Sequence, residues 1–229
     1  EITSLHPAMM PLFTKEKNFA SCKADTIAKA ILKVDLAKYK NLKLTGDLIF
    51  TNNGIRGPVV LDFARELTPI IAKHNEVPLL ISFLKGMNEE QIFTYIKKEI
   101  EKNPTATVLE NLTTLLALSV ATEICNICEI DTSEKFKNID GIKREKLIKT
   151  LAWTPLTVTG HEGFKNAMIT RGGVELKEID SKTMQSKLVS GLYFCGEVVN
   201  IDGPCGGYNL QWSFSSGYLA GKIASLEAI

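Results

Sequence analysis

One segment of the sequence, from Gly191 to Gly221, constrains the fold more than any other. It reads GLYFCGEVVNIDGPCGGYNLQWSFSSGYLAG. The pattern predicts a buried strand over 191–195, a turn at Gly196-Glu197, a loop, and a helix that starts at Gly206-Gly207 and runs towards Leu226. Glycines at a strand end let a ligand approach the backbone, and a helix start presents free N–H groups. Glycines that serve only turns and packing are the alternative, which fits less well with five glycines and a glutamate around one strand end.

Composition bounds the class of protein. The chain has 229 residues, 45% of them hydrophobic, and its 27 basic and 26 acidic side chains leave a net charge of +1. This length suits one large domain or two small ones, and the apolar content excludes intrinsic disorder. The even charge favours neither nucleic acid nor an anionic membrane as a partner. The most apolar stretch, 115–121, is too short for a transmembrane helix. Five scattered cysteines are typical of reduced thiols, so we expect a cytoplasmic protein.

Segments that favour strands and segments that favour helices alternate along the chain, and this order predicts an α+β fold. We expect residues 1–85 to form the first half of a barrel-like or mixed β-sheet and residues 86–152 an inserted helical bundle. Residues 153–180 complete the β-rich part, and residues 181–229 form a C-terminal strand and helix. The punctuation supports these boundaries: Asn52-Asn53-Gly54 is a turn signal, Pro58 suits the first turn of a helix, and Asn88 with Gln91 forms a capping box. Strands are expected over 30–36, 46–51, 77–83, 156–160 and 166–170, the last ending at Arg171-Gly172-Gly173.

Several ordered motifs together resemble one family. They are Leu48–Thr51, Gly54–Pro58, Thr170–Val174, Thr183–Lys187, and Gly196-Glu197 followed by Gly206-Gly207-Tyr208-Asn209-Leu210-Gln211. The run resembles the BaiN-like (YhiN-like) NAD(P)/FAD-dependent oxidoreductases, in which a strand ends in Gly-Glu and Gly-Gly-Tyr-Asn-Leu-Gln opens a helix. The family's N-terminal Gly-x-Gly-x-x-Gly loop does not occur here, and the chain begins at Glu1. The resemblance therefore implies the inserted domains and the last strand and helix of a two-part FAD-binding domain, without its N-terminal half.

The resemblance also implies a set of cofactor-binding residues. Glu197 would hydrogen-bond a ribityl hydroxyl of FAD, although a solvated turn carboxylate is the alternative. The amides at Gly207, Tyr208 and Asn209 would face the pyrimidine edge of the flavin. Thr170, Gly172 and Gly173 would lie near the ring, their small size leaving room for it. The full predicted set is Gly196, Glu197, Gly206, Gly207, Tyr208, Asn209, Leu210, Thr170, Gly172 and Gly173. No catalytic side chain is assigned, because hydride chemistry belongs mostly to the cofactor.

The implied function is hydride transfer through the flavin between NAD(P)H and a small, fairly apolar substrate. The absent pyrophosphate loop predicts that this chain alone binds FAD weakly or not at all. A non-catalytic binding or scaffold module that keeps the flavoprotein architecture is the alternative. Departures from the family pattern include Asn200 for Asp, Cys205 for Thr, Asn53 for His and Arg56 for Ser.

Weaker signals favour structural roles. Cys125 and Cys128 have CxxC spacing, but their place at the end of an apolar helix favours buried packing thiols over a redox pair or zinc site. The three histidines are too scattered for a metal site, and we expect His161 to be solvated in a turn. Arg56 can bind an anionic group, but a surface ion pair with Asp62 or Glu66 is favoured.

Overall fold

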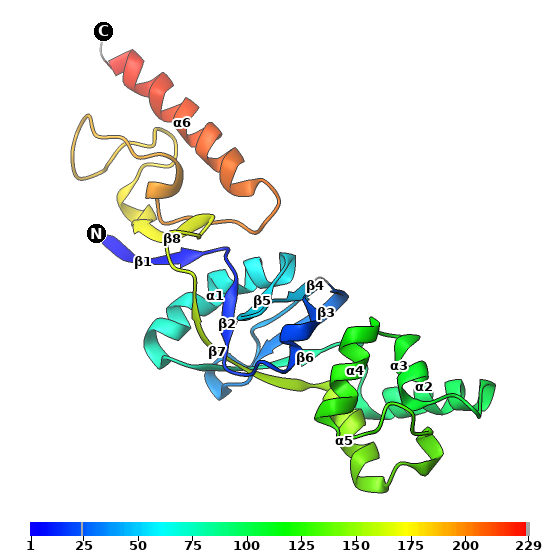
Figure 1. The fold of residues 1–229 in the computed structure, drawn as a ribbon. Helices are drawn as coiled ribbons and strands as arrows, with labels where there is room; N and C mark the ends of the chain where they lie inside the picture. Colours follow the sequence, from blue (N-terminus) through cyan, green and yellow to red (C-terminus); the bar gives the residue numbers. More distant parts are fainter. Residues whose placement is uncertain (24, 228–229) are drawn as a thin grey trace.

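Three regions follow one another along the molecule: a C-terminal segment that carries one long helix, a β-barrel, and a helical bundle at the far end (Figure 1). The structure is a computed structural model that describes residues 1–23 and 25–227. The last two residues of the expected segment 181–229 thus lie outside the described part. A two-stranded antiparallel sheet of β1 (Ile2–Ala8) and β8 (Ile169–Val174) leads from the barrel to the C-terminal segment. The fold is therefore a mixed α/β arrangement.

The barrel contains six antiparallel strands that come from both β-rich parts of the sequence. Its order is β2-β5-β4-β3-β6-β7. The strands are β2 (Leu12–Thr14), β3 (Thr26–Val34), β4 (Lys43–Phe50), β5 (Gly54–Arg56), β6 (Val77–Ser82) and β7 (Thr154–His161). Pairing of Leu12 with His161 joins β2 to β7 and closes the barrel. The expected barrel-like sheet is therefore present, and closure leaves no open sheet edge.

Helix α1 (Pro58–His74) packs against the barrel along one apolar face. Val59, Val60, Phe63 and Leu67 recur at helical spacing and are all buried. Pro58 occupies the first turn, as its missing N–H permits, and Gly57 precedes it with φ +109°. The opposite face of α1 contacts β1. It carries Asp62, Arg65 and Glu66 as well as Leu61, which packs against a small cluster of Ala8, Met9 and Ile169.

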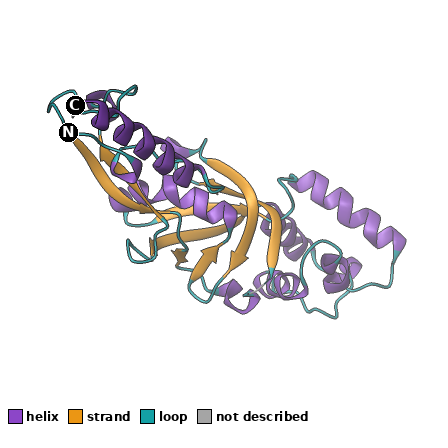
Figure 2. Ribbon diagram, turned by 90° about the horizontal axis from the view of Figure 1, so that it is seen from above, coloured by secondary structure: helices purple, strands orange, loops and turns teal. Residues whose placement is uncertain are grey.

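The bundle interrupts the barrel between β6 and β7. It contains α2 (Glu89–Lys102), α3 (Val108–Thr113), α4 (Leu118–Ile127) and α5 (Gly141–Ala152). The predicted capping box is present: Gln91 N donates to Asn88 Oδ1 at 2.8 Å, and Asn88 N donates to Gln91 Oε1 at 2.9 Å. A second capping box starts α3 at Thr107. Figure 2 shows these helices grouped to one side of the strands.

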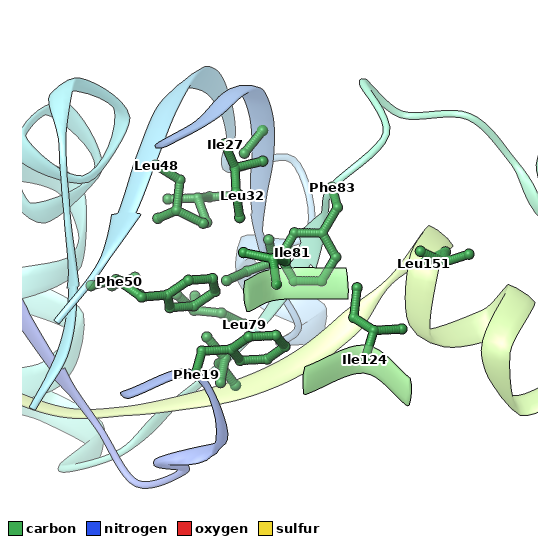
Figure 3. Close-up of a cluster of buried hydrophobic side chains, with 14 of the residues drawn as sticks. Phe19, Ile27, Leu32, Leu48, Phe50, Leu79, Ile81, Phe83, Ile124 and Leu151 are labelled. Carbon is green, nitrogen blue, oxygen red and sulfur yellow. The ribbon is translucent and has the colours of Figure 1, made fainter. Parts of the chain in front are cut away.

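Barrel and bundle share one hydrophobic core. Figure 3 shows Ile124 of α4 and Leu151 of α5 in the same cluster as Ile81 of β6 and Phe83, which directly follows that strand. Phe19, on the short 3₁₀ helix Asn18–Cys22, stacks on Phe50 with ring centroids 4.4 Å apart. The bundle is thus fastened to the barrel by continuous apolar packing rather than by its two connections alone.

The C-terminal segment corrects two predictions. β8 continues through Arg171-Gly172-Gly173 instead of ending there. The strand expected over 191–195 is absent. This segment has an isolated bridge between Tyr193 and Gln185 and scattered backbone hydrogen bonds at Leu192 and Phe194. The reason is that no neighbouring strand in the described chain continues the pairing. Helix α6 (Tyr208–Glu227) forms as expected.

The burial of Cys125, Cys128 and His161 decides the predictions made for these residues. Cys125 and Cys128 are buried and unbridged, and burial raises the pKa of Cys125 to about 11, so the prediction of packing thiols is confirmed. His161 ends strand β7 and is half-buried, so the expectation that it is solvated in a turn is wrong. Burial is the main cause that lowers the pKa of His161, and the nearby His6 lowers it further. The described residues hold no group of three or more His, Cys, Asp or Glu placed for a metal ion. None of the described helices is long and apolar enough to cross a membrane.

Candidate functional site

Two neighbouring cavities lie beside β1, β8 and the turn at Glu197, and one of them also borders the start of α6. The first, here called the helix-start cavity, has about 300 Å³ and is lined by Met9, Met168, Ile169, Glu197, Pro204, Cys205, Gly206, Gly207, Asn209, Leu210 and Ser213. The second, here called the strand cavity, has about 350 Å³ and is lined by Ile2, Leu5, Thr170, Gly173, Val174, Glu197 and Val198. Glu197 lines both cavities, so the two form one candidate site.

The structure brings most of the predicted residues together here. Glu197, Gly206, Gly207, Asn209 and Leu210 line the helix-start cavity. Thr170 and Gly173 line the strand cavity. The other predicted residues, Gly172, Gly196 and Tyr208, line neither cavity but adjoin residues that do.

Glu197 occupies the centre of this site. Its Oε1 accepts the N–H of Thr170 at 2.7 Å, which joins the two predicted halves of the site. Its turn is held by α6, because Gly196 N donates to Ser216 Oγ at 2.9 Å and Trp212 Nε1 donates to the carbonyl of Gly196 at 2.9 Å. A carboxylate has acceptor capacity beyond one hydrogen bond, and Glu197 is exposed, so it can also accept from a ligand hydroxyl.

The start of α6 is a second polar element of the site. Gly206 and Gly207 have φ +136° and +88°, a region that glycine adopts without steric cost. The side chain of Asn209 accepts from Gly203 N at 2.8 Å and donates to Gly203 O at 2.9 Å, which holds the loop against the helix. Because the first N–H groups of a helix have no intrahelical acceptor, this end presents donors and partial positive charge to the cavity.

Gly172 and Gly173 lie against backbone atoms of neighbouring segments. A Cβ at Gly172 would collide with the carbonyl oxygen of Ser4, and one at Gly173 with the carbonyl oxygen of Val198. Both residues also have positive φ, at +100° and +128°. The chain's own backbone thus takes the room at these Cβ positions. The expectation that the two residues lie near a flavin ring stays a prediction. Their glycine identity is accounted for by close backbone approach.

Sequence reasoning missed a set of charged residues that position the loop before α6. Arg65 Nε donates to Asp202 Oδ2 at 2.5 Å, and both side chains are mostly buried. On the same face of α1, Asp62 Oδ1 accepts from Cys205 N at 2.6 Å. We call Asp62, Arg65 and Glu66 the α1 clamp. Their spacing of three and four residues in a mostly apolar helix was the signal available in the sequence.

The clamp also reaches β8 and corrects the prediction for Arg56. Glu66 accepts from Arg171 Nη1 at 2.8 Å, and Asp62 is occupied by Cys205 N. Arg56 is exposed and pairs with no carboxylate among the described residues. The favoured ion pair of Arg56 is therefore wrong, because both expected partners bind other groups.

The outer face of α6 is exposed and apolar. Leu210, Phe214 and Tyr218, each four residues apart, are 65%, 70% and 73% exposed. A Cβ at Gly217 or Gly221 would meet no described atom within 4 Å. No other segment of the described chain therefore packs against these two glycines.

Comparison with known proteins finds similarity over most of the chain. Residues 15–223 match the family model described as HI0933-like protein Rossmann domain. A 3-dehydro-bile acid delta(4,6)-reductase of Clostridium scindens is 30% identical over 96% of this chain and 53% of its own length. Ribosomal RNA dihydrouridine synthases of Haemophilus influenzae and Escherichia coli are 35% and 32% identical, each over 75% of this chain and 40% of its own length. The chain thus spans about half or less of the curated relatives it matches.

Proposed function

Because this chain belongs to the HI0933-like Rossmann-domain family, we propose that it is part of an FAD-dependent oxidoreductase that transfers a hydride between NAD(P)H and a small, fairly apolar substrate. The resemblance to the BaiN-like flavoproteins, drawn from short motifs, is confirmed by the family match and by the relative from Clostridium scindens. The observation that carries the proposal is the convergence of Glu197, Gly206, Gly207 and Asn209 on one cavity beside Thr170.

The residues of the site suit a flavin. Glu197 offers an acceptor for a ribityl hydroxyl, and the start of α6 offers N–H donors and positive potential for an electron-rich ring edge. Gly207 leaves the approach to these donors open, since a Cβ there would meet no atom within 4 Å. When bound, FAD supplies the hydride chemistry, and the protein supplies binding, orientation and electrostatics.

We further propose that the outer face of α6 is covered by the other half of the flavin domain, which carries the pyrophosphate loop. Three observations support this: the exposed stripe of Leu210, Phe214 and Tyr218, the missing strand over 191–195, and the coverage of about half of the relatives. In a two-part domain, a neighbouring strand of the other half completes the pairing of residues 191–195. The apolar stripe then becomes part of a core.

The test is flavin content of the complete protein. We expect it to purify yellow with stoichiometric flavin and to lose flavin when Gly207→Trp blocks the helix start. Glu197→Gln, which keeps shape but removes charge, weakens flavin binding less. Gly163→Trp is the matched control, because Gly163 also has positive φ and open space but lies outside both cavities. A colourless complete protein overturns the proposal and supports a non-catalytic module.

The chain by itself is expected to bind FAD weakly or not at all, because two contacts without the pyrophosphate loop leave most of the cofactor unheld. Equilibrium dialysis of the 229-residue chain with FAD measures this. Tight stoichiometric binding contradicts it and places the whole binding site within this chain.

A second candidate substrate is ribosomal RNA, favoured by the two dihydrouridine synthases, whose identity over the matched part exceeds 30%. NADPH oxidation by the complete protein, followed with a small apolar enone and separately with ribosomal RNA, distinguishes the two. We expect turnover with the enone. Turnover with RNA alone transfers the proposal to the nucleic-acid substrate.

A further inference from the structure

A cavity of about 450 Å³ lies between the barrel and the bundle, away from the candidate flavin site. It shares no lining residue with the helix-start cavity or the strand cavity. Its walls come from the start of β3, the segment after β6, Tyr95 of α2, and residues 114–117 between α3 and α4. We call it the barrel–bundle cavity. Its volume is within the range of small-molecule sites.

The floor of this cavity is apolar and fixed. Ile27, Phe83, Leu84 and Leu116 are all buried and belong to the core that barrel and bundle share. A floor made of core side chains is close-packed and well ordered, so it presents a preformed apolar surface to a ligand. Binding there removes apolar surface of both partners from water.

The rim of the cavity carries polar side chains, among them Lys85. Lys85 lines the cavity, is exposed, and forms no ion pair with any carboxylate among the described residues. Lys85 and Gly86 have φ +54° and +80°, so the chain turns sharply beside the cavity. The carboxylate of Asp25, next to the lining residue Thr26, accepts the hydroxyl of Ser119. Tyr95 adds a partly exposed phenol on the α2 side.

We propose that the barrel–bundle cavity binds a small molecule with an apolar body and one anionic group, a carboxylate or sulfonate. The body lies on the buried floor, and the anion meets the ammonium of Lys85 at the rim. The apolar floor of the cavity favours the apolar body of the ligand. The ammonium of Lys85, which forms no ion pair among the described residues, favours the anionic group. This inference does not depend on the proposed flavin chemistry.

Two fluorescent probes of similar shape test the proposal on the 229-residue chain. Anilinonaphthalene sulfonate is anionic, and phenylnaphthylamine is its neutral counterpart. We expect both to bind, and Ala28→Trp, which fills the cavity from an exposed position on β3, to weaken both more than about ten-fold. Lys85→Gln is expected to weaken the sulfonate about five-fold, as for an exposed ion pair, and to leave the neutral probe unchanged.

Matched controls separate this cavity from other apolar surfaces. Ser215→Trp fills the apolar cavity of about 350 Å³ beneath α6, and Lys98→Gln removes an exposed lysine of α2 that does not line the barrel–bundle cavity. Neither should change either affinity, and urea midpoints show that all variants are folded. Loss of binding in Ser215→Trp but not in Ala28→Trp overturns the proposed site. An unchanged sulfonate affinity in Lys85→Gln overturns the anionic group.

Discussion

The barrel and bundle bury most of their large apolar side chains, whereas the C-terminal segment leaves many of its own exposed. The barrel and bundle bury one continuous core that runs from Leu12 to Val158 in the sequence. The C-terminal segment buries a small cluster of Ile179, Met184, Val199 and Ala220. It exposes large apolar side chains from Leu176 to Leu226 at the same time. The first region therefore supplies its own hydrophobic stabilisation, whereas the second depends on what covers it.

The attachment of the two regions differs in chemistry as well. Continuous apolar contact joins the bundle to the barrel. The C-terminal segment is joined by backbone pairing of β1 with β8 and by the α1 clamp, which holds Asp202 and Cys205. Polar attachment fixes orientation without burying much apolar surface, which suits a loop that has to place the start of α6. Four predictions sharpen this contrast, from the largest effect to the smallest.

The largest effect is expected in the shared core. Phe63 is fully buried, and Phe63→Ala should lower the free energy of unfolding by about 3–5 kcal/mol in urea denaturation, because a cavity remains. Phe214 on α6 is 70% exposed, and Phe214→Ala should change it by about 0.5 kcal/mol or less. Equal losses in the two variants would show that α6 packs its outer face within this chain.

The next effect concerns the glycines of β8. Gly173→Ala should cost about 2–3 kcal/mol, because positive φ and collision with the carbonyl of Val198 act together. Gly191→Ala is the control, since Gly191 has φ +75° but open space around its Cβ position, and it should cost about 1 kcal/mol. Urea midpoints measure both. A tolerated Gly173→Ala would mean that β8 and the 196–200 turn can separate.

The α1 clamp should act locally. Arg65→Met leaves the mostly buried Asp202 without its main partner, at a cost of about 1–2 kcal/mol. Amide hydrogen exchange should accelerate in residues 202–207 and stay unchanged in the barrel strands. The double variant Arg65→Met/Asp202→Leu should recover part of the loss. Uniform acceleration across the barrel contradicts a local role.

The effect that is smallest near neutral pH is a pH dependence in the core, which develops only above pH 9. Burial raises the pKa of Cys125 from its usual 9.0 to about 11, so the folded protein holds this proton more tightly than the unfolded chain does. The resulting stability is complete below pH 9 and is lost as pH rises through 11. Wild type should therefore lose stability more steeply than Cys125→Ala across this interval.

The exposed Cys195 and Cys205 should react with a thiol reagent before the buried cysteines do.

The sequence by itself determined where several helices begin, including the helix start that lines the candidate site. The capping box at Asn88, the Pro58 helix start and the Gly206-Gly207 opening of α6 depend on residues near in sequence, so short patterns suffice to predict them. Strand content on both sides of the bundle predicted a barrel-like sheet. Ordered motifs led to the correct family.

Only the tertiary structure decided how distant residues combine. The α1 clamp joins Arg65 to Asp202 across 137 positions, and no local pattern marks that pair. The roles of Gly172 and Gly173 depend on Ser4 and Val198, which approach them only after β1 and the 196–198 turn are in place. The predicted strand over 191–195 fails for the same reason. Strand formation requires a neighbour for its hydrogen bonds, and a neighbour is a property of the assembled fold.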